Sequence, residues 1–329
     1  MLKLFERNTV VQVILILVVT LLLWAGSLAH PQAPLPSAHY TPLYDLLCAL
    51  NLSPLPATLL ALALVLWAGF YLNFILSKAN LLAQNNLLPT LLFVLAASAG
   101  KQELSPSLLA ALVVVPIVGR LMLHGTLLTI PQNKIFATAA LIGIASMFYL
   151  PSLVLLLAYL LIAINYRLYN WHDWTMLLLG LMAPWIPLWA FHFLADSLPG
   201  QFDQMLSSIG PLQFSVGPFT TLQAIANSVL LAVFLVSLVV VLRRMGEKTV
   251  VWQRNSTTVM LITVAAVALL PLSQLFPVSL QFFAVPFAFS LSHRLTLRRR
   301  PTPPLAHKSW RSHLYDLLFL VTIIAAILC

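Results

Sequence analysis

The segment that decides the fold is 87-LLPTLLFVLAASAG-100, the first of four short apolar segments that follow one another along the chain. The other three are residues 104–121, 135–149 and 153–165. Each comes close to the minimum length that can cross a hydrocarbon core of roughly 30 Å as a helix. Short polar breaks separate them. The sequence therefore predicts a short-helix bundle over residues 87–166 that lies in a membrane.

The composition of the whole chain fits the same environment. Of its 329 residues, 61% are hydrophobic and 8% are charged, whereas soluble globular domains carry about 25% charged residues. Apolar segments cover most of the sequence and leave no polar face for water. We therefore expect an all-α, polytopic helical membrane protein in which residues 1–329 form a single integral membrane domain.

About 11 transmembrane helices are predicted, several of them short or kinked by proline. They are residues 9–29, 57–77, 87–100, 104–121, 135–149, 153–165, 174–195, 218–242, 257–272, 275–292 and 314–329. With the N-terminus in the cytoplasm, sixteen of the seventeen Lys and Arg residues fall on the cytoplasmic side, and only Lys101 falls outside. This agrees with the positive-inside rule and predicts a periplasmic C-terminus in a bacterial inner membrane.

Two alternatives to this topology are open. A pair of short segments could re-enter the membrane without crossing it, which would leave the sidedness of the charges unchanged. The residues Ser27-Leu28-Ala29 resemble a signal-peptidase site, so the first segment could also be a cleaved signal peptide.

The loops divide the predicted domain. Residues 30–56 form a first periplasmic loop, in which Thr41–Asn51 is expected to be an interfacial helix. Residues 196–217 form a second periplasmic loop, and residues 293–313 form a basic cytoplasmic linker. The arginine run in this linker, Arg298–Arg300, fits a topological stop or a contact with anionic lipid. The basic excess is explained by topology, so nucleic acid is not an expected partner.

The predicted membrane interior is nearly free of ionisable groups, which argues against an ion-coupled transporter. Candidate chemistry lies instead on the outer face. His192 and Asp196 are four residues apart and share one helix face, and Asp45 supplies a second carboxylate in the first loop. A carboxylate that holds an imidazole is a simple acid–base arrangement. Asp45, His192 and Asp196 are therefore the candidate catalytic residues.

A simpler interpretation of these residues stands beside the catalytic one. Acids collect outside wherever the positive-inside rule keeps bases away, and a histidine among aromatic residues is typical of the membrane-interface belt. The sequence has no His-x-x-x-His or Cys-x-x-Cys pair and no glycine-rich phosphate loop. We therefore expect neither a metal site nor a cofactor. Cys48 and Cys329 both fall outside, and whether they pair is left open.

Four motifs carry a resemblance to a known family. They are the opening Met-Leu-Lys-Leu-Phe, the run Lys78…Asn85-Asn86-x-Leu88-Pro89, the stretch Gly143–Pro151, and Asn170-Trp-x-x-Trp174. In these motifs the chain resembles an uncharacterised family of polytopic inner-membrane proteins, a domain of unknown function from Bacteroidota-type Gram-negative bacteria. The resemblance implies location and fold and supplies neither an activity nor a site.

A looser likeness is to integral membrane glycosyltransferases that use polyprenyl-linked sugars. In that likeness Asp45 would take the position of the base in the first outer loop. The chain departs from these enzymes because it lacks the paired acids of that loop and has no soluble domain. It also offers only Lys101 outside to hold a phosphate, a group that favours Arg or several Lys.

The sequence thus favours an accessory or scaffolding role in cell-envelope assembly. The expected partners are the lipid bilayer, with anionic or polyprenyl lipids, and other membrane proteins of the envelope. The first alternative is an enzyme, a polyprenyl-linked sugar glycosyltransferase acting at the periplasmic face. The second is a lipid or polyprenyl carrier.

Overall fold

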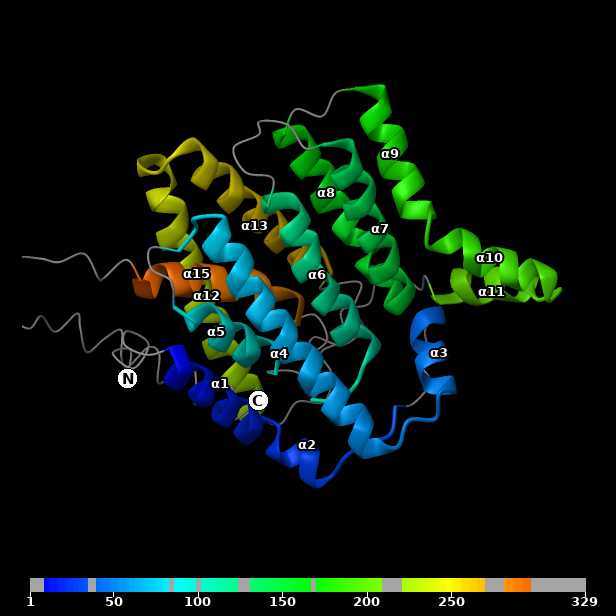
Figure 1. The fold of residues 1–329 in the computed structure, drawn as a ribbon, viewed down its shortest axis with the longest axis horizontal. Helices are drawn as coiled ribbons and strands as arrows, with labels where there is room; N and C mark the ends of the chain where they lie inside the picture. The colour runs from blue at the N-terminus through cyan, green and yellow to red at the C-terminus, as the bar shows by residue number, and fades with distance from the viewer. Residues whose placement is uncertain are drawn as a thin grey trace, which may run out of the picture.

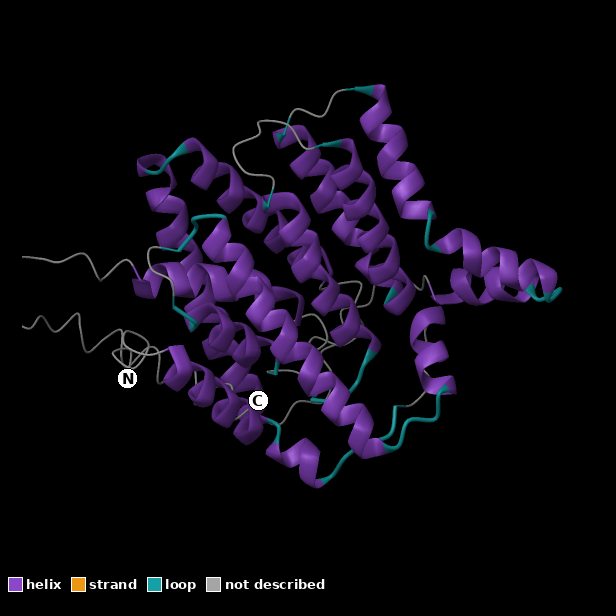
Figure 2. Cartoon of the chain, in the orientation of Figure 1, coloured by secondary structure: helices purple, strands orange, loops and turns teal. Residues whose placement is uncertain are grey.

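The computed structural model describes residues 9–34, 40–82, 86–98, 102–123, 131–166, 170–208, 221–269 and 281–296. Within these ranges the only regular structure is helical (Figures 1 and 2), which confirms the all-α prediction. The last predicted span, most of the basic linker, Lys101 and Cys329 lie outside the described residues.

Most of the described helices overlap the predicted apolar segments. In the first half they are α1 (Thr9–Leu23), α2 (Ala25–Ala29), α3 (Pro42–Ala49), α4 (Pro54–Lys78), α5 (Leu88–Ala97), α6 (Pro106–Met122) and α7 (Gln132–Phe148). In the second half they are α8 (Val154–Asn165), α9 (Trp171–Met182), α10 (Trp185–Leu194), α11 (Leu198–Ser208), α12 (Thr221–Arg244), α13 (Val250–Leu269) and α15 (Ala284–Thr296). Short 3₁₀ turns occupy Leu150–Leu153, Met245–Glu247 and Gln281–Phe283. Relative to the predicted segments, α13 begins earlier, α15 begins later, and α11 lies in a predicted loop.

Local sequence explains where several helices begin. A proline lies in the first turn of α4, α5 and α6, where its missing N–H costs no hydrogen bond. Ser105 caps α6, because its hydroxyl accepts a hydrogen bond from the backbone N–H of Leu108 at 3.3 Å. α3 lies inside the predicted interfacial segment Thr41–Asn51. α11 is a helix within the residues that the sequence assigns to the second outer loop.

Helix length limits which elements can cross a bilayer alone. Among the described residues, the 25-residue α4 is the only single helix long and apolar enough to do so. α9 and α10 reach that length and hydropathy together, but they meet at a bend of 47°. The ten-residue α5 spans only about 15 Å at 1.5 Å per residue. The structure thus offers one or two membrane-capable helices, and the eleven-span arrangement stays a prediction.

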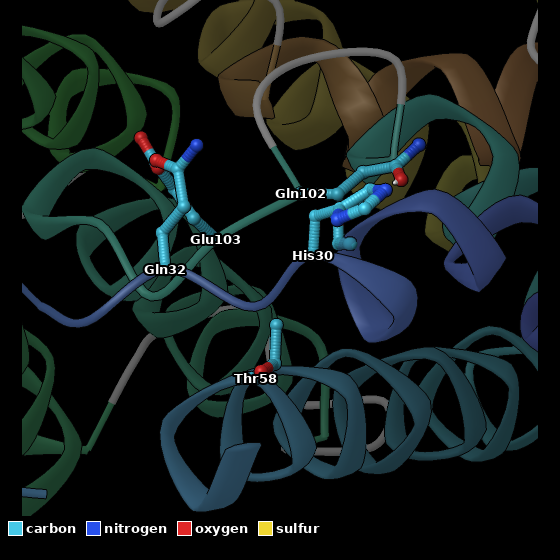
Figure 3. Close-up of a pocket in the computed structure, with 6 residues that line it drawn as sticks. His30, Gln32, Thr58, Gln102 and Glu103 are labelled. Atoms are coloured by element: carbon cyan, nitrogen blue, oxygen red, sulfur yellow. Dashed lines mark hydrogen bonds between the residues drawn. The ribbon is translucent and has the colours of Figure 1, made fainter. Parts of the chain in front are cut away.

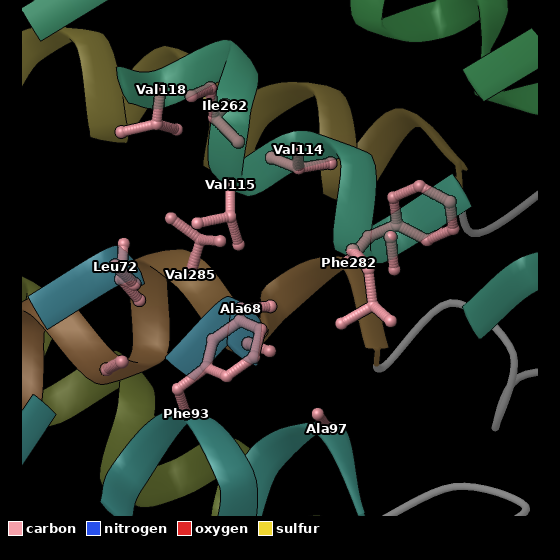
Figure 4. Packing of buried hydrophobic residues seen from close by; sticks show 14 of the residues in the cluster. Ala68, Leu72, Phe93, Ala97, Val114, Val115, Val118, Ile262, Phe282 and Val285 are labelled. Carbon is pink, nitrogen blue, oxygen red and sulfur yellow. The ribbon is translucent and has the colours of Figure 1, made fainter. Parts of the chain in front are cut away.

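The core of the molecule is built around α5. Every residue of α5 is buried, and the helix packs against α1, α4 and α15. Figure 4 shows Phe93 of α5 beside Ala68 and Leu72 of α4, with Val285 of α15 close by. The short apolar segment that opens the bundle is therefore the centre of the fold, enclosed by protein on all sides.

The helix ends that carry basic residues gather on one side of the molecule. In Figure 1 the end of α4, the end of α6 and the start of α7 lie on the side opposite α2 and α3. Contacts join some of these ends: the Lys134 ammonium donates a hydrogen bond to the Leu123 carbonyl at 2.9 Å. The Arg254 guanidinium of α13 lies 4.9 Å from the centre of the Tyr166 ring, just after α8.

The opposite side carries α3 and a projecting hairpin, defined here as α10 and α11 (Figure 1). A small aromatic cluster holds these elements together. The Tyr40 ring stacks on Trp185 with centroids 6.4 Å apart, and the Tyr40 N–H donates to the Ser208 hydroxyl at 2.7 Å. The Trp185 indole N–H in turn donates to the Ser146 hydroxyl of α7 at 3.2 Å. The hairpin is thereby attached to both the first loop and the bundle.

Candidate functional site

A polar cavity of about 230 Å³ opens on the side of the molecule that carries α2 and α3. The end of α2, the start of α4 and the segment between α5 and α6 meet there. Its lining residues are Ser27, His30, Gln32, Thr58, Gln102 and Glu103. Figure 3 shows His30 and Gln102 on one side of the cavity, Gln32 and Glu103 on the other, and Thr58 on α4 below them. Because every lining side chain is polar in a chain so rich in apolar residues, this cavity is the candidate site.

Hydrogen bonds fix one wall of this cavity. The Trp24 indole N–H donates to the Ser98 hydroxyl at 3.0 Å, which ties the end of α1 to the end of α5. The Gln102 amide nitrogen donates to the Ser98 carbonyl at 3.2 Å, and the Gln102 amide oxygen accepts from the Ser27 hydroxyl at 3.4 Å. Both ends of the Gln102 amide are therefore held before any ligand arrives.

The floor of the cavity is a buried threonine of α4. Thr58 is 2% exposed, and its hydroxyl donates to the Pro54 carbonyl at 2.7 Å. This bond uses the donor of the hydroxyl and leaves acceptor capacity on its oxygen.

Tyr44 links the cavity to α3. It is 2% exposed, and its hydroxyl donates to the carbonyl of Leu104, the residue after Glu103, at 2.9 Å. Burial is the largest cause that raises the pKa of Tyr44, and Cys48 is the next. Negative charge on Glu103 and on Asp45 raises this pKa further. The carboxylates of Glu103 and Asp45 therefore both raise the pKa of the Tyr44 hydroxyl.

Asp45 lies on α3 beside this tyrosine. The Thr41 hydroxyl donates to a carboxylate oxygen of Asp45 at 3.3 Å. Although Asp45 is exposed as a residue, desolvation of its carboxyl group raises its pKa, and the hydrogen bond from Thr41 opposes that change only in part. A carboxyl group with a raised pKa is suited to proton transfer, as the catalytic interpretation of Asp45 requires.

His192 and Asp196 lie at the end of α10, and both have a structural task there. The His192 Nδ1 atom and the Ser197 hydroxyl are 2.9 Å apart. Asp196 has a φ of 51°, and the N–H of Ser197 after it donates to the His192 carbonyl at 3.0 Å. This left-handed residue with a following backbone hydrogen bond is the usual way to end a helix.

The three predicted catalytic residues fall into two places. Asp45 lies on α3 next to Tyr44, whose hydroxyl bonds to the residue after Glu103, and it does not line the cavity. His192 and Asp196 lie at the end of α10, on the projecting hairpin. The aromatic contact between Tyr40 and Trp185 connects the two places, but within the described residues no hydrogen bond or ion pair joins any two of the three. Their joint catalytic role stays a prediction.

The sequence does not assign a site role to any of the cavity residues, which are Ser27, His30, Gln32, Thr58, Gln102 and Glu103. Ser27 enters the sequence analysis only as part of a possible cleavage motif. The cavity residues come from three separate chain segments, so no local spacing marks them. The one available signal was that His30 and Gln102 both lie at outer ends of predicted spans.

Within the described residues, no group of three or more His, Cys, Asp and Glu side chains lies close enough together to hold a metal ion. Comparison with known protein families, with curated proteins and with solved structures finds no match for this chain.

Proposed function

We propose that this chain is a multi-pass protein of the bacterial inner membrane with an accessory or scaffolding role in cell-envelope assembly. The observation that carries the proposal is the projecting hairpin of α10 and α11. Phe193 and Leu194 are 70% and 84% exposed, and Phe191 and Leu206 are exposed as well. Large apolar side chains exposed to this degree are stable against lipid or a partner protein rather than water.

Two further features support the membrane placement. Basic helix ends gather on the side opposite the hairpin (Figure 1), as the positive-inside rule requires of cytoplasmic ends. Apolar residues of α1 and α4, such as Ile14 and Trp67, face outward where lipid would cover them. The motif resemblance to an uncharacterised inner-membrane family is consistent with the same location.

The scaffolding function is tested by cross-linking in living cells. A photoreactive residue replaces Leu194 on the hairpin, and the matched control replaces Leu59, an exposed leucine of α4. We expect a protein adduct of defined mass at position 194 and only lipid adducts at position 59. If position 194 gives no protein adduct and the purified protein migrates as a lone monomer, the scaffolding function is wrong.

The raised pKa of Asp45 and its hydrogen bond from Thr41 favour one alternative, a polyprenyl-linked sugar transferase at the outer face. Asp45→Asn keeps the size of the side chain and its acceptor for Thr41 but removes the acid. Asp203→Asn, at an exposed acid of α11, is the matched control. If the protein has a scaffolding function, envelope glycans should be unchanged in both variant strains at equal protein levels. Loss of a glycan in Asp45→Asn alone would favour the transferase instead.

A further inference from the structure

We propose that the polar cavity binds the neutral, hydroxyl-rich headgroup of a membrane glycolipid, with one sugar ring inside the cavity and the lipid chain along α4. This inference goes beyond the scaffolding function and does not depend on it. It rests on the size of the cavity, on the chemistry of its lining and on the apolar surface beside it.

The volume of the cavity limits what can enter. The volume of the cavity is about 230 Å³. Cavities for drug-sized ligands are larger, about 300–1,000 Å³. The part of the ligand that enters is therefore a single small group such as one sugar ring.

The lining chemistry selects hydroxyl groups. Two glutamines and two hydroxyl residues offer both donors and acceptors, which is what a polyol needs because each of its hydroxyls is both at once. The Gln102 amide is already held by Ser27 and by the backbone of Ser98, so little side-chain freedom is lost on binding. Among the lining residues that the structure describes, the amides of Gln32 and Gln102 and the hydroxyls of Ser27 and Thr58 are neutral hydrogen-bonding groups. These neutral groups match the hydroxyls of an uncharged sugar ring.

The exposed apolar surface beside the cavity indicates that the sugar belongs to a lipid. Thr58, at the floor of the cavity, lies between Leu55 and Leu59, and both leucines are 51% exposed. Leu22 and Leu21 of α1, five and six residues before Ser27, are exposed as well. A lipid chain attached to the bound ring would lie on this apolar surface, and its burial there would add to the affinity at roughly 25 cal/mol for each Å² covered.

The test uses the full chain in nanodiscs of phosphatidylethanolamine and a fluorescent monoglucosyl diacylglycerol as the probe. We expect the fluorescent glucolipid to bind saturably. Free glucose and unglycosylated diacylglycerol should compete with it only weakly. Gln102→Ala should weaken binding about five- to tenfold, the loss expected for one or two hydrogen bonds. Gln32→Ala should also weaken it. Because Gln32 is exposed, its substitution changes stability little, which keeps the test valid if Gln102→Ala misfolds. Gln204→Ala on the exposed face of α11 is the control and should bind as the parent does.

Three results would overturn the inference. The first is unchanged glucolipid binding in both Gln32→Ala and Gln102→Ala. The second is free glucose that competes as well as the glucolipid, because the lipid chain would then contribute nothing. The third is phosphatidic acid that competes equally, because the cavity would then accept an anion. None of these results bears on the cross-linking test of the hairpin.

Discussion

At the scale of single residues, the most unusual environment described is that of His293. The sequence places it at the start of the basic cytoplasmic linker, just past the predicted span 275–292. In the structure it is 2% exposed, with its ring centre 5.0 Å from that of Trp252 and 6.1 Å from that of Phe289. Burial, followed by the positive charge of Lys248, lowers the pKa of His293 to about 4, and the Leu81 carbonyl opposes this only in part.

This lowered pKa predicts acid sensitivity. Between the ordinary pKa of 6.5 and the folded-state value of about 4, the unfolded chain binds a proton that the folded chain does not. The free energy of unfolding therefore falls as the pH falls through this window, by on the order of 3 kcal/mol over its full width. Above pH 6.5 the residue contributes no pH dependence.

Thermal unfolding of the protein in detergent at pH 7.5 and at pH 4.5 measures this effect. In His293→Leu the drop in melting temperature between the two pH values should be smaller than in the parent protein, because the ionising group is gone. Equal drops in the two proteins would contradict a lowered pKa of His293 in the folded protein.

At the scale of elements, α7 and α9 approach each other most closely at glycine. A Cβ atom on Gly180 of α9 would meet the Phe136 carbonyl oxygen and would lie 2.9 Å from the Ala139 Cβ. A Cβ on Gly143 of α7 would lie 2.6 Å from the Leu181 carbonyl oxygen. Small residues at such contacts are what allow two membrane helices to pack backbone against backbone.

Gly180→Ala should therefore destabilise the protein by about 1–3 kcal/mol, because the added methyl forces the two helices apart. Gly26→Ala is the matched control, since a Cβ there has no atom within 4 Å and alanine favours a helix. Melting temperatures in one detergent compare the two. A Gly180→Ala protein as stable as Gly26→Ala would contradict the close packing of α7 against α9.

Element positions were largely predictable, whereas the site was not. Long apolar runs and prolines at helix starts define α4 and α6 from sequence, and Pro184 lies at the break that the structure places between α9 and α10. Apolar content could not distinguish a lipid-facing helix from a fully buried one, so the burial of all of α5 was not foreseen. The cavity was missed because Ser27, Thr58 and Gln102 meet only through tertiary packing.

At the scale of the whole molecule, the basic helix ends lie on the side opposite the hairpin. The end of α4, the end of α6 and the start of α7 lie on one side, whereas α2, α3 and the hairpin lie on the other (Figure 1). Lys78, Arg120 and Lys134 belong to the first group of helix ends, and Asp45 belongs to α3. A water-soluble arrangement has no reason to separate charge in this way, whereas insertion into a membrane does. The scaffolding role and the glycolipid site both require that the hairpin and the cavity face the periplasm.

The central claim is therefore tested most directly by the accessibility of single cysteines to a membrane-impermeant maleimide. In a chain with Cys48→Ser and Cys329→Ser, one cysteine is placed at an exposed position: Gln32→Cys beside the cavity, Gln204→Cys on the hairpin, or Gly246→Cys after α12. The account predicts that positions 32 and 204 react in spheroplasts with intact inner membranes, and that position 246 reacts only after the membrane is opened. Labelling of position 246 in intact spheroplasts, or protection of position 204, would contradict it.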